Sequence, residues 1–211
     1  MQKVLLIIFI IVLATSQALC NQELLDTFLI RNKEINSFQA TFEQRNYWPE
    51  SDMELFSYGH LYTKKDKIML DFYAPTKQVM LGTEDDLRLY FPEKNQLIIQ
   101  DWSYWQNFIN PKLLAKEYLE FCNLESTKHF KNVTIFKFKP TEIMSDFKEL
   151  IIQFSNSDSL IQALEYKDQY NNEVGFYFTE PYINTGIPDD IFTLPVPENT
   201  TIIDQRTTKQ E

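Results

Sequence analysis

The chain has 211 residues, of which 44% are apolar and 24% are charged, and its formal net charge is −10. This composition is that of a globular protein, and a chain of this length can bury a core without disulfides or a structural metal. The negative charge argues against nucleic acid as a partner, because binding to phosphates requires clusters of Lys and Arg. The chain contains 17 Phe, 11 Tyr and 3 Trp but only 4 Gly. Aromatic-rich strands are therefore expected, and glycine-rich phosphate loops are not.

The first 18 residues have the pattern of a cleavable secretory signal peptide. A short basic start at Met1–Lys3 precedes an apolar run from Val4 to Ala14, and Ser16 and Ala18 provide small residues at a cleavage site. Cleavage after residue 20 is the alternative. Lipidation of Cys20 is disfavoured, because the residues around it depart from the usual lipoprotein signal. No later segment is apolar enough to span a membrane, so we expect a soluble exported protein.

The remaining chain alternates between two hydrophobic periods. Residues 23–34 carry apolar side chains at helical spacing, and residues 105–120 do so again. From Ser37 the period changes to two, which is typical of a half-buried strand, and Pro75 should end the third strand. The predicted strands span residues 37–43, 56–64, 68–73, 77–81, 86–91, 96–102, 133–139, 147–154, 160–167, 173–178 and 191–194.

This order of elements predicts one α+β domain over residues 19–205, followed by a flexible tail at 206–211. Consecutive strands at hairpin spacing form antiparallel sheets, and two helices can cover one face of such a sheet. The expected fold is therefore a strongly curved antiparallel sheet, an unclosed β-barrel, with a helical lid. A sheet of this length under only two helices is expected to leave an apolar hollow on its inner face.

Catalytic and metal-binding motifs are not recognisable in the sequence, so we expect no enzyme activity and no cofactor. Neither His60 nor His129 has a ligand or nucleophile at the spacing that a metal site or a catalytic pair requires. The carboxylates of residues 84–86 are expected in an exposed turn, where they would only be solvated. Cys122 is interpreted as a small buried apolar residue on a helix.

Several stretches in the right order resemble the outer-membrane lipoprotein carrier protein (LolA) family. Ser37–Gln44 is similar to that family's first strand, Ser-Phe-x-Ala-x-Phe-x-Gln, which also follows an amphipathic helix. The further stretches that carry the resemblance are Gly59–Tyr62 with Lys64, Ile68, Leu70, Phe72 and Pro75, then Asp86–Tyr90, Asp146–Phe154, Leu160–Asp168, Asn184, Phe192–Leu194 and Pro197.

The resemblance implies a periplasmic chaperone that holds the acyl chains of lipoproteins in a hydrophobic cavity. Such a carrier takes lipoproteins from an inner-membrane ABC transporter and delivers them to an outer-membrane receptor, and it is expected to be a monomer. The residues expected to line the cavity are Phe38, Phe42, Leu61, Ile68, Leu70, Phe72, Leu87 and Leu89. If the strand parity were shifted by one residue, Met69, Met80 and Trp102 would line it instead.

Lys64 and Lys65 occupy the place where the family usually has Arg-Pro. The family Arg is thought to hold the lid shut through hydrogen bonds to helix residues, and Lys keeps its charge but loses its planar set of donors. We therefore expect Lys64 and Lys65 to act as a weaker or differently connected lid latch. The alternative is that they are only the charged residues of a hairpin turn.

Two other functions remain open from the sequence. The same fold could serve as a receptor or as a sensor domain for exported lipids, and a lipid-anchored receptor would require an acylated Cys20. It could also be an interaction module that binds polypeptide, in which case its interior would be fully packed.

Overall fold

The computed structural model describes residues 21–101, 110–115, 119–141, 147–194 and 196–207. The predicted signal peptide, Cys20, Trp102 and half of the predicted helix at 105–120 lie outside these residues. Among the described residues, a metal-binding group of three His, Cys, Asp or Glu side chains is absent. Nor does any helix in the same ranges have the length and apolarity needed to cross a membrane.

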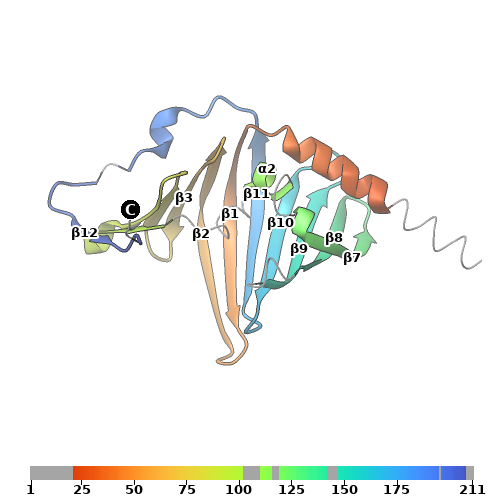
Figure 1. Cartoon of the computed structure of the whole chain (residues 1–211), viewed down its shortest axis with the longest axis horizontal. Coiled ribbons are helices and arrows are strands. Elements are labelled where there is room, and N and C mark those ends of the chain that lie inside the picture. Colours follow the sequence, from red (N-terminus) through yellow and green to blue (C-terminus); the bar gives the residue numbers. More distant parts are fainter. Residues whose placement is uncertain (1–20, 102–109, 116–118, 142–146, 195, 208–211) are drawn as a thin grey trace, which may run out of the picture.

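The described residues form a single 12-stranded sheet that is strongly curved and unclosed (Figure 1). Its order is β12-β6-β5-β4-β3-β2-β1-β11-β10-β9-β8-β7, so β12 and β7 are the two free edges. The strands are β1 (Ser37–Trp48), β2 (Met53–Lys64), β3 (Lys67–Ala74), β4 (Gln78–Gly82), β5 (Leu87–Phe91), β6 (Gln96–Gln100), β7 (Cys122–His129), β8 (Val133–Pro140), β9 (Phe147–Ser155), β10 (Ile161–Asp168), β11 (Glu173–Ile183) and β12 (Thr201–Asp204).

The predicted α+β class and antiparallel meander are confirmed. Neighbouring strands from β1 to β6 and from β7 to β11 pair antiparallel, and β1 joins the two halves by pairing with both β2 and β11. Pro75 follows the last residue of β3, as expected from its missing backbone donor. The one exception is β12, which pairs parallel with β6.

The helix at residues 21–33 and the short one at residues 111–113 pack on the same face of the sheet. Residues 21–33 form the main helix, which lies across the ends of the strands of the C-terminal half (Figure 1). The predicted second helix is described only as α2 (Pro111–Leu113), with a helical turn continuing to residue 115, and as the 3₁₀ helix η4 (Leu119–Phe121). Asn110 caps α2, because its side-chain oxygen accepts from the backbone N–H groups of Lys112 and Leu113.

Two local predictions were wrong. Residues 191–194 are not a strand: Asp189–Phe192 form the 3₁₀ helix η6, which follows Pro188 and has two acidic residues in its first turn. Cys122 does not lie on a helix but begins β7, a strand whose side chains are either half-buried or exposed. Burial alone raises the pKa of the Cys122 thiol from 9.0 to about 11.

Candidate functional site

The inner face of the sheet, on which the helices lie, carries a continuous apolar cluster. Strand alternation places Phe38, Ala40 and Phe42 of β1 on this face, where each is at most 6% exposed. Leu61 of β2 lies opposite Ala40 and is fully buried. Because β1 joins the two halves of the sheet, its side chains contact apolar residues of both halves. We call this group the inner cluster.

The predicted cavity residues all belong to the inner cluster or pack against it. Seven of the eight are at most 6% exposed, and Leu89 is half-buried against them. These residues are Phe38, Phe42, Leu61, Ile68, Leu70, Phe72, Leu87 and Leu89. Of the residues named for a shifted parity, Met80 also belongs to the inner cluster, whereas Met69 faces the opposite side. Acyl-chain binding by these residues stays a prediction.

Aromatic rings form the centre of the inner cluster. The Phe42 ring meets Phe72 edge-on at a centroid distance of 5.1 Å and meets Phe176 of β11 at 5.8 Å. Phe38 and Phe178 form a second edge-on pair at 5.8 Å. Such pairs gain attraction beyond their buried area, because the positive ring edge faces the negative ring face.

Gly59 makes room for the Phe42 ring. The two residues are cross-strand partners on β2 and β1. A Cβ on Gly59 would lie 2.7 Å from Phe42 Cζ and 2.7 Å from the backbone oxygen of Asp71. A larger residue at position 59 would therefore force either the ring or the neighbouring strand to move.

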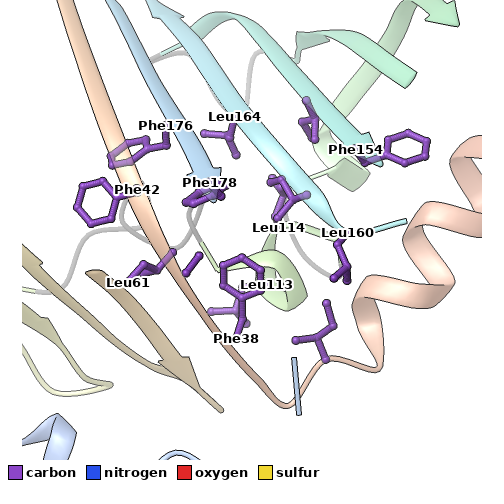
Figure 2. Packing of buried hydrophobic residues seen from close by; sticks show 14 of the residues in the cluster. Phe38, Phe42, Leu61, Leu113, Leu114, Phe154, Leu160, Leu164, Phe176 and Phe178 are labelled. Carbon is purple, nitrogen blue, oxygen red and sulfur yellow. The ribbon is translucent and has the colours of Figure 1, made fainter. Parts of the chain in front are cut away.

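Helical residues cover the inner cluster from one side. Phe28 of the 21–33 helix is fully buried, and its ring lies 4.9 Å from that of Phe154. Leu113 and Leu114, in and just after α2, are buried in the same cluster as Phe38 and Phe178 (Figure 2). We call the helical segments 21–33 and 110–115 the roof.

Side-chain packing and a few hydrogen bonds attach the roof to the sheet. Asn32 Nδ2 donates to the Ser159 backbone oxygen at 3.0 Å, and Asn110 Nδ2 donates to the Lys65 oxygen at 3.2 Å. Lys112 of α2 also donates to the Asn36 side chain. None of these bonds belongs to a strand ladder.

Lys64 is anchored to the segment that follows β11. Its ammonium donates to the Ile187 backbone oxygen at 2.7 Å and to Asp189 Oδ1 at 2.8 Å. The hydrogen bond from Lys64 lowers the pKa of the Asp189 carboxyl below its usual 3.8. Lys65 takes part through its backbone, because its N–H donates to the Asn36 oxygen and its own oxygen accepts from Asn110.

Lys65 therefore contacts Asn36, just before β1, and Asn110 of the roof, whereas the Lys64 ammonium contacts the C-terminal segment. A latch role for this pair stays a prediction.

The opposite, outer face of the sheet carries a smaller apolar group. Met69 and Leu81 are covered there by Ile187 and Phe192, which belong to the segment held by Lys64. We call these four residues the outer cluster. A pocket of about 220 Å³ lies beside it, lined by Tyr62, Met69, Asp71, Val79, Ile191, Thr193 and Leu194.

Asp86 departs from the exposed acidic turn expected at residues 84–86. Glu84 and Asp85 are exposed, but Asp86 is buried and accepts two hydrogen bonds from Arg88, at 3.0 and 3.1 Å. Arg206 lies 3.5 Å from the same carboxylate. A buried carboxylate requires such partners, so this residue holds the C-terminal strand region in place.

The roof residues Phe28, Leu113 and Leu114 are the part of the site that sequence reasoning did not name. Phe28 was readable as part of a helical stripe, but its contact with Phe154 joins residues far apart in the chain. The capping role of Asn110 had a local signal, because Asn followed by Pro111 is a common helix start.

Comparison with known proteins identifies the family. The family model described as "Outer membrane lipoprotein carrier protein LolA" matches residues 33–195. The chain belongs to the LolA family. No curated protein matches its sequence.

Solved structures share the fold at low sequence identity. An uncharacterized conserved protein from Thermus thermophilus is 14% identical, with a TM-score of 0.56 over 88% of this chain and 99% of that chain. A LolA superfamily protein from Nitrosomonas europaea is also 14% identical, with a TM-score of 0.45 over 80% and 97% of the two chains. In the Pseudomonas aeruginosa MucA/MucB complex, the matched chain is 14% identical, with a TM-score of 0.45 over 82% of this chain and 60% of that chain. The likeness to the Thermus protein shows the fold that the two chains share.

Proposed function

We propose that this LolA-family protein is a non-catalytic periplasmic chaperone that shields the acyl chains of lipoproteins. In this proposal it takes lipoproteins from an inner-membrane ABC transporter and delivers them to an outer-membrane receptor. The observation that carries the proposal is the inner cluster beneath a roof whose hydrogen bonds to the sheet lie outside the strand ladders. Parting the roof from the sheet would uncover a continuous apolar surface built from Phe38, Phe42, Leu61, Leu70 and their neighbours.

The energetics favour a carrier whose own side chains occupy the binding site when no lipid is bound. Each methylene removed from water contributes about 0.8 kcal/mol, so one long acyl chain of about 14 methylenes gains roughly 11 kcal/mol. Opening the roof removes contacts of Phe28, Leu113 and Leu114, each of which is at most 6% exposed. The lost contacts offset much of the gain, which keeps binding reversible, as a shuttle requires.

Binding of a synthetic triacylated lipopeptide to the purified mature protein tests the proposal. The same peptide without acyl chains is the control. We expect the acylated peptide to co-elute with the protein in gel filtration and to displace a fluorescent fatty acid, and the control peptide to do neither. Equal binding of both peptides would refute lipid shielding.

A photoreactive fatty acid then tests the site itself. Neighbouring residues of β2 and β3 alternate between the inner and outer faces, so each strand contains its own control. Cross-links should form at Leu61 and Leu70 of the inner cluster and not at Tyr62 and Met69 beside the outer cluster. Cross-links at Tyr62 or Met69 would show lipid on the outer face and would contradict binding at the inner cluster.

The tight packing of the inner cluster favours one alternative, a polypeptide-binding sensor or receptor. Phe38, Leu61 and Leu70 are all fully buried, as expected of an interior in which side chains pack against one another. A sensor of this kind would bind the unacylated peptide and would not respond to the fatty acid. The lipopeptide experiment therefore separates the two functions directly.

A further inference from the structure

The outer face of the sheet contains a second pocket, separate from the inner cluster. It has a volume of about 160 Å³ and lies over β1, β2 and β11, where side chains of opposite parity to Phe38 and Leu61 project. Its lining residues are Gln39, Ala40, Thr41, His60, Tyr62, Glu180 and Tyr182. We call it the bulge pocket.

A β-bulge shapes this pocket. In the pairing of β1 with β11, Gln39 lies opposite Tyr182 and Thr41 lies opposite Thr179, so Glu180 and Pro181 together face Ala40. Glu180 has a φ of 51°, in the left-handed region that residues other than glycine seldom occupy. Bulges and such backbone conformations concentrate at functional sites, because they redirect a side chain out of the regular ladder.

The chemistry of the bulge pocket suits a positively charged group. Within the ranges that the structure describes, no Lys, Arg or His forms an ion pair with the Glu180 carboxylate. Tyr62, Tyr182 and His60 line the same pocket, and Tyr182 is 54% exposed. A carboxylate together with tyrosine rings attracts a guanidinium or an ammonium through charge and cation–π interactions.

We propose that the bulge pocket binds an Arg or Lys side chain of a partner polypeptide. Tyr62 lines both this pocket and the 220 Å³ pocket beside the outer cluster, whose walls include Met69, Val79 and Leu194. The two pockets share Tyr62, and one is lined by the Glu180 carboxylate while the other has mostly apolar walls. This pair of pockets fits a polypeptide that presents a basic and an apolar side chain. The net charge of −10 also favours encounter with a basic partner.

This site is independent of lipid shielding on the inner face. Loss of lipopeptide binding would leave the bulge pocket unaffected, and loss of the bulge pocket would leave the inner cluster intact. The two proposals can therefore fail separately.

NMR titration of the ¹⁵N-labelled protein tests the pocket. The probes are short acetylated peptides that carry arginine next to leucine, and the same peptides with citrulline, which has the arginine shape without its charge. We expect the arginine peptide to shift the amide signals of Thr41, His60, Tyr62 and Tyr182, and the citrulline peptide to bind about tenfold more weakly.

The variant Glu180→Gln removes the charge and keeps the size of the side chain. It should weaken binding of the arginine peptide roughly three- to fivefold, which is the range for a partly exposed ion pair. Glu198→Gln is the matched control, because it removes the same charge from an exposed residue outside the pocket. It should leave binding unchanged, and the spectra of both variants report whether the fold is intact.

Four results would overturn the proposal. They are equal binding of the arginine and citrulline peptides, equal effects of Glu180→Gln and Glu198→Gln, and the absence of binding by any peptide. The fourth is a shift of the pocket signals by phosphatidylethanolamine vesicles alone, which would assign the pocket to a lipid ammonium group.

Discussion

Substitution of Gly59 by Ala tests whether the packing of the inner cluster requires a residue without a side chain beneath the Phe42 ring. The new Cβ would lie 2.7 Å from Phe42 Cζ and from the Asp71 backbone oxygen, whereas ordinary contacts begin at 3.4 Å. Overpacking of this kind costs about 1–3 kcal/mol. Replacing glycine also lowers the conformational entropy of the unfolded chain, which stabilises the folded protein by roughly 0.4–1 kcal/mol. We therefore expect a net destabilisation of about 1–2 kcal/mol.

Urea denaturation followed by far-UV circular dichroism measures this effect. With a slope of about 2 kcal/mol per molar urea, the midpoint should fall by roughly 0.5–1 M. Two other glycines provide matched controls. Gly175→Ala brings a Cβ to 2.9 Å only from the side chain of Tyr177, which can rotate away, and Gly186→Ala meets no atom within 4 Å.

The expected order of stability is therefore Gly186→Ala, then Gly175→Ala, then Gly59→Ala as the least stable. In a Phe42→Leu background the ring contact disappears but the Asp71 contact remains, so the cost of Gly59→Ala should fall without vanishing. If Gly59→Ala is as stable as the natural protein, or if Gly186→Ala is destabilised equally, the reasoning from close packing is wrong.

Three further predictions concern the roof, the C-terminal segment and the thiol. Phe28→Ala should destabilise the protein by about 3–5 kcal/mol in urea denaturation because Phe28 is fully buried, and Ile30→Ala, at 63% exposure on the same helix, should change stability by less than about 0.5 kcal/mol. Lys64→Gln should lower the urea midpoint above about pH 5, and this difference should shrink toward about pH 3. The pKa of Asp189 is lowered in the folded state, so the stabilisation by this ion pair is present above pH 3.8 and is lost as the carboxyl is protonated. A difference that stays constant with pH would contradict this ion pair. Cys122 should react with a disulfide reagent at neutral pH about 100-fold more slowly than a thiol of pKa 9.0, with a rate that rises until about pH 11, and an ordinary rate would show that the thiol is not desolvated.

Strand parity was readable from the sequence wherever one face of a strand is buried. In β1 the apolar residues Phe38, Ala40 and Phe42 alternate with polar ones, so a single period fixes the inner face. The helix at residues 21–33 was readable for the same reason, through its stripe of Leu25 and Phe28.

The parts that could not be predicted are those whose pattern depends on distant partners. β7 forms an edge of the sheet, and its mixture of half-buried and exposed side chains gives no clear alternation. β12 has only four residues and is defined by its pairing with β6, about a hundred residues earlier. The bulge at Glu180 likewise appears only once β1 and β11 are aligned, because the extra residue has no signature within β11 itself.

The position of β12 in the chain has a consequence for truncated protein. A chain that ends near Ile183 lacks the segment that covers Met69 and Leu81 and the strand that pairs with β6. Such a chain presents both an uncovered apolar patch and a row of unsatisfied backbone groups along β6. Exposed strand edges of this kind pair with other chains. Translational stalling or proteolytic trimming near Ile183 would therefore convert an otherwise complete sheet into a template for aggregation.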